Sequence, residues 1–288
     1  MQPIRTLFTA EPERVPPQLP EGLRSQYGGD LRFPSVSDGR SYVIANFVST
    51  LDGVVSFNIP GQSGGAPISG SNEEDRFIMG LLRASADAVL VGSGTVDAVG
   101  PEHLWTAEFI YPDASDLYKH YRKALLEAPR PLIVILSGTG RLDLSRAVFH
   151  TPAVNVLIMT TEGGRETLES AGAESLVSTE VRVQPAAEGR IAPAAILNIL
   201  REDFGVAMLL VEGGPSLFGN FLACGFVDEL FLTVAPQIAG RAPNHPKPAL
   251  VSDAEFTPAT APWLELLSVR TAGDHLYLRY RKNERDAR

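Results

Sequence analysis

Glu212 and the residues that follow it form the most informative junction in the sequence. The run LLVEGGPSLFGNFL reads as an apolar strand that ends at Glu212, two glycines, and a helix that begins at Pro215. The first N–H groups of a helix have no partner within it, so this junction predicts an anion site. A buried carboxylate is costly unless it binds a partner, which makes Glu212 a functional candidate. The alternative is an acid that caps the helix and binds no ligand.

A second strand-to-helix junction lies in the run VLVGSGTVDA. Gly92 and Gly94 let a ligand approach the backbone, and the Thr95 hydroxyl can donate to a phosphate oxygen. The pattern G-x-G-x-x-D matches the dinucleotide-binding fingerprint weakly, because Asp97 stands where a third glycine or alanine is needed. An ordinary tight turn between strand and helix is the alternative.

Asp52 follows another apolar run, in the segment STLDG. Asp-Gly is a strong turn dipeptide, so an ordinary turn is the alternative to a functional carboxylate at this position. Two phosphate-binding junctions, together with acids at strand ends, nevertheless predict a phosphorylated nucleotide as ligand.

An alternation of strands and helices from residue 41 onward must position these residues. Apolar runs without polar alternation predict strands that are covered on both faces, as in a parallel sheet. The predicted strands are 42–49, 86–92, 131–137, 153–160, 206–212, 228–238, 264–270 and 275–281, and the predicted helices are 71–85, 113–127, 165–171, 192–203 and 215–224. The last two strands form a predicted hairpin. The fold class is therefore α/β, with a mostly parallel central sheet and an antiparallel C-terminal edge.

The domain organisation follows from where this alternation begins. Prolines and a glycine pair interrupt every period in residues 1–40, which predicts an N-terminal extension that wraps the surface. No internal repeat or linker follows, so we expect one domain over residues 41–288.

Composition excludes several function classes. The formal net charge is −9, from 25 Lys and Arg against 34 Asp and Glu, so binding to nucleic acid or to anionic membranes is not expected. We expect a cytoplasmic protein, because the first residues do not resemble a secretory signal and no apolar run reaches about 18 residues. The single cysteine, Cys224, excludes an intramolecular disulfide, and its apolar neighbours predict a core thiol. The scattered histidines predict no metal site.

In this order, the junctions resemble the pyrimidine reductase family of riboflavin biosynthesis, which is the reductase half of a bifunctional deaminase/reductase. The matching stretches are NFVSTLDG, the glycine-rich segment to PISG, LLRASADAVLVGSGTV and LLVEGGPSLFGNFLACGFVDELFLTVAPQIAG, within residues 41–282. The resemblance implies a dihydrofolate-reductase-like, three-layer α/β/α fold in a stand-alone, homodimeric reductase. It also implies NADPH-dependent reduction of the ribosyl group of a 5-amino-6-ribosylamino-pyrimidine 5′-phosphate to ribityl, with the cofactor supplying the hydride.

The resemblance also assigns roles to individual residues. Asp52 and Glu212 are the candidate catalytic residues, and we hypothesise that Asp52 donates a proton or organises the site. Gly65, Pro67 and Glu212 match substrate-contacting positions. With the glycines of the two junctions, the candidate cofactor-binding set is Val48, Ser49, Gly92, Gly94, Thr95, Ser137, Gly213, Gly214, Pro215, Ser216 and Leu217.

One segment departs from the family's pattern. After the threonine turn the family continues with an acid, Asp-x-Pro and an L-T-x-R motif that help to hold the substrate's ribose phosphate. This chain has DAVGPEHLWTAEF, with Val99 at the acid position and no arginine, although Arg83 in LLRAS is retained. Two alternatives therefore stay open: an NADPH-dependent reductase of a pterin or dihydrofolate-like compound, and a non-enzymatic NADPH-binding protein.

The 2′-phosphate of NADPH requires a cation or several hydrogen-bond donors. Arg141, or alternatively Thr160, Thr161 and Arg165, follow the ends of two predicted strands and are candidates on that position alone.

Overall fold

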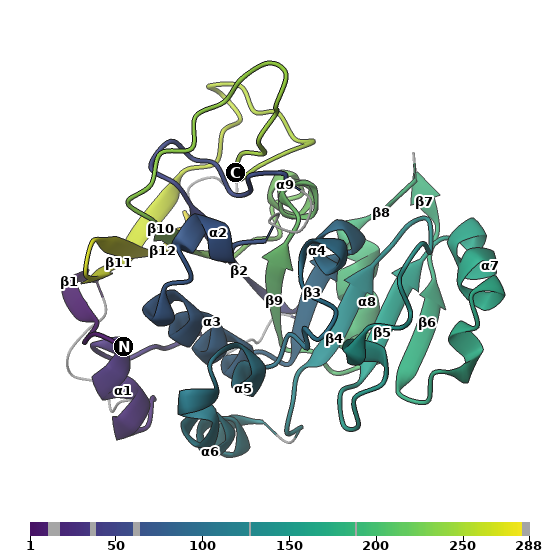
Figure 1. The fold of residues 1–288 in the computed structure, drawn as a ribbon, viewed down its shortest axis with the longest axis horizontal. Coiled ribbons are helices and arrows are strands. Elements are labelled where there is room, and N and C mark those ends of the chain that lie inside the picture. The colour runs from purple at the N-terminus through teal and green to yellow at the C-terminus, as the bar shows by residue number, and fades with distance from the viewer. Residues whose placement is uncertain (11–17, 35–38, 60–63, 127, 188, 284–288) are drawn as a thin grey trace.

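The computed structural model describes residues 1–10, 18–34, 39–59, 64–126, 128–187 and 189–283. The strands are β1 (Arg5–Thr9), β2 (Tyr42–Ser49), β3 (Ala88–Gly92), β4 (Leu132–Leu136), β5 (Val156–Thr160), β6 (Thr179–Val183), β7 (Ala186–Ala187), β8 (Arg190–Ile191), β9 (Met208–Gly213), β10 (Glu229–Val234), β11 (Leu264–Ala272) and β12 (His275–Lys282). Ten of them form one sheet in the order β1-β11-β12-β10-β2-β9-β3-β4-β5-β6, and β7 pairs with β8 (Figure 1).

The strands of the sheet run in the directions that the sequence predicted. The seven adjacent strands from β10 to β6 are parallel to one another. The C-terminal hairpin of β11 and β12 then adds an antiparallel edge to β10, and β1 extends that edge. The mostly parallel sheet with an antiparallel C-terminal edge is therefore confirmed.

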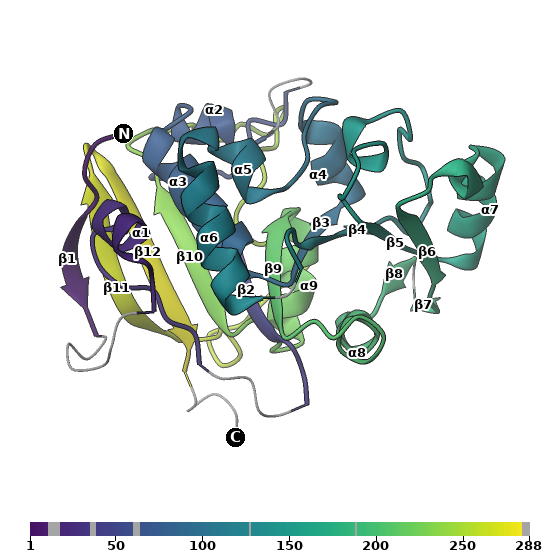
Figure 2. The same cartoon turned by 90° about the horizontal axis from the view of Figure 1, so that it is seen from below.

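Helices cover both faces of the sheet (Figure 2). Their bounds are α1 (Glu21–Tyr27), α2 (Ala66–Ser69), α3 (Glu73–Ser85), α4 (Ser93–Ala98), α5 (Ala107–Ile110), α6 (Ser115–Leu125), α7 (Glu162–Ser170), α8 (Pro193–Glu202) and α9 (Pro215–Ala223), with 3-10 turns at Pro112–Ala114, Ala147–Phe149 and Ala173–Ser175. One apolar core joins α1, α3, α6 and α7 to one face, and a second joins α8 and α9 to the other. In β3, Val89 and Val91 belong to the first core while Ala88 and Leu90 belong to the second. This alternation explains why the central strands are apolar throughout.

The described part of residues 1–40 belongs to the same sheet and core. β1 pairs antiparallel with β11, and Ile4, Leu23 and Tyr27 lie in the core that also holds α3. The described part of this segment is therefore not only a surface extension, because it contributes a strand to the sheet and side chains to the core. Prolines 12, 16 and 17, which helped to predict an irregular extension, lie outside the described residues.

Three local predictions differ from the structure. The sequence did not indicate β6, a short strand whose side chains are half-buried or exposed. The tight turn expected at Gly94 and Thr95 is the short helix α4. The prediction that Cys224 is a core thiol was wrong, because α9 ends at Ala223 and Cys224 is exposed just beyond it.

Within the described ranges, no helix is both long and apolar enough to cross a membrane. In the same part of the chain, no group of three or more His, Cys, Asp or Glu side chains is arranged to hold a metal ion.

A buried ion pair fastens the antiparallel edge to the parallel strands. Glu229 on β10 is 0% exposed, and its Oε2 accepts a hydrogen bond from Nε of Arg279 on β12 at 2.8 Å. Its Oε1 accepts from the Tyr42 hydroxyl on β2 at 2.8 Å and from Nη2 of Arg281 at 3.1 Å. One carboxylate thus links three adjacent strands.

Removing that carboxylate will leave Arg279 as a buried cation without its main partner. We therefore expect Glu229→Ala to lower the free energy of unfolding by about 3–5 kcal/mol, measured by urea denaturation. The control is Glu265→Ala on β11, an exposed carboxylate, which should change that free energy by no more than about 0.5 kcal/mol. If the two variants unfolded at the same urea concentration, this role for Glu229 would be contradicted.

Candidate active site

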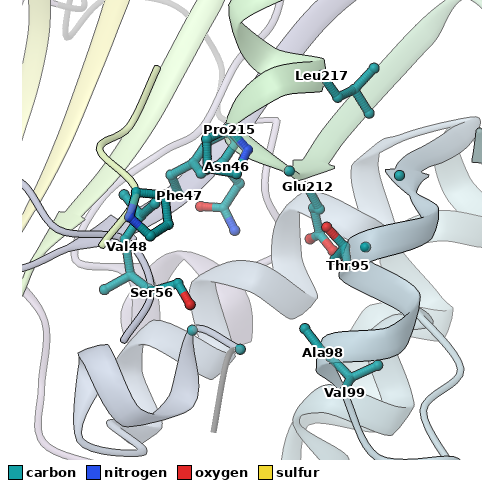
Figure 3. A pocket seen from close by; sticks show the side chains of 18 of the residues that line it. Asn46, Phe47, Val48, Ser56, Thr95, Ala98, Val99, Glu212, Pro215 and Leu217 are labelled. Atoms are coloured by element: carbon teal, nitrogen blue, oxygen red, sulfur yellow. The ribbon is translucent and has the colours of Figure 1, made fainter. Parts of the chain in front are cut away.

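A cleft of about 930 Å³ opens at the carboxyl ends of β2, β9, β3 and β4. Ligands of open parallel sheets bind at this edge, outside the ends of the strands. Pockets for small ligands usually measure roughly 300–1,000 Å³, so this cleft has room for a large ligand. Figure 3 shows side chains from β2, α4, β9 and α9 around the opening.

Glu212 enters the cleft from an irregularity in β9. In the pairing of β3 with β9, Leu90 lies opposite Val211 and Val91 lies opposite Gly213, so Glu212 is an extra residue on its strand. Such a bulge re-aims the side chain that it contains. The Glu212 side chain is accordingly directed into the cleft (Figure 3).

Arg83, at the C-terminal end of α3, binds the Glu212 carboxylate. Its Nε lies 3.1 Å from Oε1 and 2.9 Å from Oε2, and its Nη2 lies 2.7 Å from Oε2. The two side chains are only 2% and 4% exposed. Glu212 therefore has the partner that a buried carboxylate requires, and its described hydrogen bonds come from Arg83 rather than from the first turn of α9.

His103 extends this ion pair toward an aromatic group. Its Nε2 lies 3.4 Å from Nη2 of Arg83, and its ring packs against Trp105 and Phe109 at centroid distances of 4.6 and 5.0 Å. Burial, and next the Arg83 cation, lower the pKa of His103 to about 3. The imidazole is therefore neutral at pH 7, and the nitrogen that faces the guanidinium is the acceptor. An aromatic group thus occupies the segment in which the family's phosphate-holding motif is altered.

The neutral state of His103 predicts how stability changes with pH. An unfolded histidine has a pKa of about 6.5, so the unfolded chain takes up this proton first as the pH falls. Between pH 7 and pH 5 the wild type should lose about 1–2 kcal/mol more unfolding free energy than His103→Gln, whose side chain does not titrate. Denaturant titrations of both proteins at the two pH values measure the difference. An identical loss in both would show that His103 is protonated in the folded state.

Gly213 is a glycine because Thr95 lies against its α-carbon. A Cβ at Gly213 would lie 2.5 Å from Oγ1 of Thr95. Gly214 has a φ of 76°, in the left-handed region, and begins α9 as its N-cap. Both glycines line the cleft together with Thr95. The two junctions that the sequence singled out are therefore packed against each other.

We expect Gly213→Ala to displace Thr95 and to lower the unfolding free energy by about 1–3 kcal/mol. The matched control is Gly163→Ala, near the start of α7, where a Cβ would meet no atom within 4 Å. This control should be neutral or slightly stabilising, because alanine is the better helix former. Urea denaturation compares the two variants, and a Gly213→Ala protein as stable as the control would contradict the close packing.

The structure brings most of the candidate binding residues to one place. The predicted residues that line the cleft are Val48, Gly65, Pro67, Gly92, Gly94, Thr95, Glu212, Gly213, Gly214, Pro215, Ser216 and Leu217. Ser49 and Ser137 are not among the lining residues and are buried, at 5% and 1% exposure. Residues 61–63 of the glycine-rich segment lie outside the described residues.

Asp52 lies apart from the cleft lining and organises a turn. Its carboxylate accepts hydrogen bonds from the Thr50 hydroxyl at 2.6 Å and from the N–H groups of Ala239 and Gly240 at 3.0 and 2.8 Å. These bonds, that from Thr50 first, lower the pKa of Asp52 to about 2. A carboxyl with such a pKa holds no proton to donate at neutral pH, so the geometry favours the organising half of our hypothesis for Asp52.

The four candidates for the 2′-phosphate lie outside the cleft lining. Arg165 forms ion pairs with Glu162 and Glu169 on its own helix, and Arg141 is exposed. The hydroxyls of Thr160 and Thr161 donate to the carbonyls of residues 137 and 138 at 2.6 and 2.7 Å. These side chains therefore do not converge on a ligand.

The sequence analysis missed several cleft residues, among them Asn46, Asp75 and Arg76. Asn46 is an amide within the apolar strand β2, a contrast that was visible in the sequence. Asp75 and Arg76 lie in the first turn of α3, each about two turns before Arg83. Burial raises the pKa of Asp75, although hydrogen bonds from Thr233 and then Ser69 oppose the shift.

Arg76 is the cleft cation whose hydrogen-bonding capacity is least used. Its Nε is buried and has no hydrogen-bond partner among the described residues. Arg76 and Arg83 are seven residues apart, which places them on one face of α3. Helical spacing from Arg83 was the signal that could have found it.

Comparison with known proteins decides the family. Residues 41–278 match the model of the RibD C-terminal domain. The chain belongs to this family. A 2,5-diamino-6-ribosylamino-4(3H)-pyrimidinone 5′-phosphate reductase of Archaeoglobus fulgidus is 28% identical over 201 residues, 70% of this chain and 83% of that protein. The riboflavin biosynthesis protein RibD of Aquifex aeolicus is 26% identical over 217 residues, and the match covers 72% of this chain but only half of that protein.

Solved structures of the family share the fold. A pyrimidine reductase-like protein of Corynebacterium diphtheriae superposes with a TM-score of 0.63 at 21% identity, covering 85% of this chain and 92% of the other. RibD of Acinetobacter baumannii superposes with a TM-score of 0.62 at 24% identity, covering 86% of this chain and 60% of the other. The three-layer, dihydrofolate-reductase-like fold implied by the sequence is therefore confirmed.

Proposed function

We propose that this chain is an NADPH-dependent reductase that converts the ribosyl group of a 5-amino-6-ribosylamino-pyrimidine 5′-phosphate to ribityl. The single observation that carries the proposal is the cleft itself. It joins the glycine-lined start of α9 to the buried Glu212–Arg83 pair at the carboxyl edge of the sheet, in a member of the family that includes pyrimidinone 5′-phosphate reductases.

The residues at the start of α9 suit a dinucleotide pyrophosphate. The missing Cβ of Gly213 lets Thr95 pack against the strand end with its hydroxyl beside the glycine, and the missing Cβ of Gly214 keeps the backbone accessible from the cleft. The N–H groups of Ser216 and Leu217 are in the first turn of a nine-residue helix, where the helix dipole favours an anion. NADPH, when bound there, supplies the hydride.

The opposite side of the cleft is proposed to hold the substrate. Glu212 accepts from hydroxyl or amino groups of the substrate, and Arg83 keeps that carboxylate in place. Gly65 and Pro67 also line the cleft. Arg76, whose Nε has no partner among the described residues, binds the 5′-phosphate of the substrate. It does so in place of the arginine that the 99–108 segment lacks.

Consumption of NADPH by the purified protein tests the function. The ribosylamino-pyrimidinone phosphate and dihydrofolate are offered separately, and NADPH is also titrated alone. Turnover of the pyrimidinone supports the proposal. Turnover of dihydrofolate alone would favour a pterin reductase, and binding of NADPH without turnover of either compound would favour a non-enzymatic binding protein.

Replacing Arg76 tests how the substrate phosphate is held. Arg76→Gln should raise KM for the phosphorylated pyrimidinone by about tenfold to 100-fold, the equivalent of one charge-assisted hydrogen bond. KM for NADPH should stay unchanged. Arg141→Gln, which removes an exposed arginine outside the cleft lining, is the control. If Arg76→Gln raises KM equally for the dephosphorylated compound, Arg76 does not bind the phosphate.

A further inference from the structure

Asp75 is a buried carboxyl group of the cleft that the proposed substrate contacts do not use. It lies in the first turn of α3, lines the cleft, and is 5% exposed. Its carboxyl accepts hydrogen bonds from two hydroxyl groups, those of Thr233 on β10 and Ser69 on α2. The ion pairs formed within the described part of the chain do not include Asp75.

The cleft therefore holds two buried carboxyl groups with different partners. Glu212 is paired with the guanidinium of Arg83, which favours the charged form of a carboxyl, whereas Asp75 has hydroxyl partners. Burial raises the pKa of Asp75, and the negative charge of Glu212 adds to that rise. Two carboxyl groups whose surroundings separate their proton affinities commonly divide the acid and base roles of a reaction.

The next step rests on the proposed function. In the ribosylamino group, the ring oxygen leaves C1 as a hydroxyl with the proton of the N–H group, which gives an open chain with a C=N bond. Hydride from the cofactor adds to C1 with its electron pair, and the π electrons of the C=N bond move to the nitrogen. The nitrogen must then take up one proton to become the amine, so the reaction requires an acid.

We propose that Asp75 is the catalytic acid that donates this proton to the nitrogen. The O–H bond of its carboxyl breaks as the N–H bond forms, and the resulting carboxylate recovers a proton from solvent before the next turnover. Asp52, the acid that the sequence suggested, cannot take this part, because hydrogen bonds lower its pKa to about 2 and it lies outside the cleft lining. Glu212 keeps its place beside Arg83 as a hydrogen-bond acceptor for the substrate.

Three titratable groups act on Asp75 from the elements packed against it: Glu212 on β9, and His275 and Tyr277 on β12. Nε2 of His275 lies 3.0 Å from the carbonyl oxygen of Ser69. Burial, and next the charge of Asp75, raise the pKa of Tyr277, so this phenol is neutral over the range in which a carboxyl titrates. His275 is therefore the group that an experiment has to separate from Asp75.

The pH dependence of a single turnover tests the inference on the full chain. The rate constant for NADPH oxidation with the pyrimidinone phosphate should fall at alkaline pH, as Asp75 loses its proton. Asp75→Asn keeps the size of the side chain but has no acidic proton. It should lower this rate constant by about 10²–10⁴-fold and abolish the alkaline fall. Affinity for NADP⁺, measured by calorimetric titration, should change by no more than about twofold.

Asp97→Asn is the matched control, because it makes the same substitution at an exposed position of α4 outside the cleft lining. It should keep the wild-type rate constant and its pH profile. His275→Gln should also keep an alkaline fall, because the imidazole does not supply the proton.

Thr233→Val tests the inference without removing the carboxyl. The Thr233 hydroxyl stabilises the charged form of Asp75, so its loss should move the alkaline fall to higher pH. A merely structural role for Asp75 would leave the fall where it is. This variant decides the question even where Asp75→Asn fails to fold.

Each other outcome has a distinct meaning. If Asp75→Asn keeps the wild-type rate constant or its alkaline fall, another group donates the proton and the inference is wrong. If the fall disappears in His275→Gln, the imidazole is the acid. If the wild type reduces the pyrimidinone without any alkaline fall, the inference fails while the proposed function survives. If the wild type does not reduce the pyrimidinone, the proposed function itself fails and the inference fails with it.

Discussion

The buried pair of Glu212 and Arg83 is the interaction on which the site depends. Two nearly inaccessible charges tolerate burial only together, and removing either one would leave the other without compensation. Both are held by the fold: the bulge in β9 turns Glu212 into the cleft, and α3 brings Arg83 to it. Nη1 of Arg83 donates to the carbonyl of Thr106, and His103 lies beside Nη2, which also donates to Glu212. The segment after α4 is thereby attached to the centre of the sheet.

Close backbone packing shapes the opposite side of the cleft. Glycines stand where neighbouring segments leave no space for a Cβ, at Gly213 against Thr95 and at Gly138 against Gly189. Each contact joins the end of a parallel strand to a segment that belongs to another strand. This part of the cleft is therefore shaped by close packing between strand ends and the segments beside them, and a single methyl group is enough to disturb it.

The altered segment between Val99 and Glu108 gives the substrate side its particular character. Two relatives named as pyrimidinone 5′-phosphate reductases are 28% and 29% identical to this chain over 201 and 203 residues. In the altered segment this chain has a neutral imidazole and an indole. A neutral imidazole brings no positive charge to a phosphate, so any hydrogen bond that it forms there is weaker than one from an arginine. In the proposed function, that charge comes instead from Arg76 on α3, whose Nε has no hydrogen-bond partner among the described residues.

The sequence by itself determined the parallel strands, the terminal hairpin and the two glycine junctions. These features depend on residues that are neighbours in the chain: apolar runs, a two-residue turn between β11 and β12, and glycines directly before a helix. Glu212 was identifiable for the same reason, because a charged residue ends an apolar strand. Local pattern was misleading where exposure depends on orientation, as at Cys224, and where a short polar strand pairs at the edge, as in β6.

Only the tertiary structure decided which side chains act together. Arg83 and Glu212 are separated by 129 residues, and Asp52 by 187 from the N–H group of Ala239 that it binds. Arg165 and Arg190 look alike as arginines near strands, yet one is held by carboxylates of its own helix and the other lines the cleft. Periodicity and spacing indicate only the strand or helix in which a residue lies. The partner of a buried charge is set by how separate strands and helices pack, which no local pattern encodes.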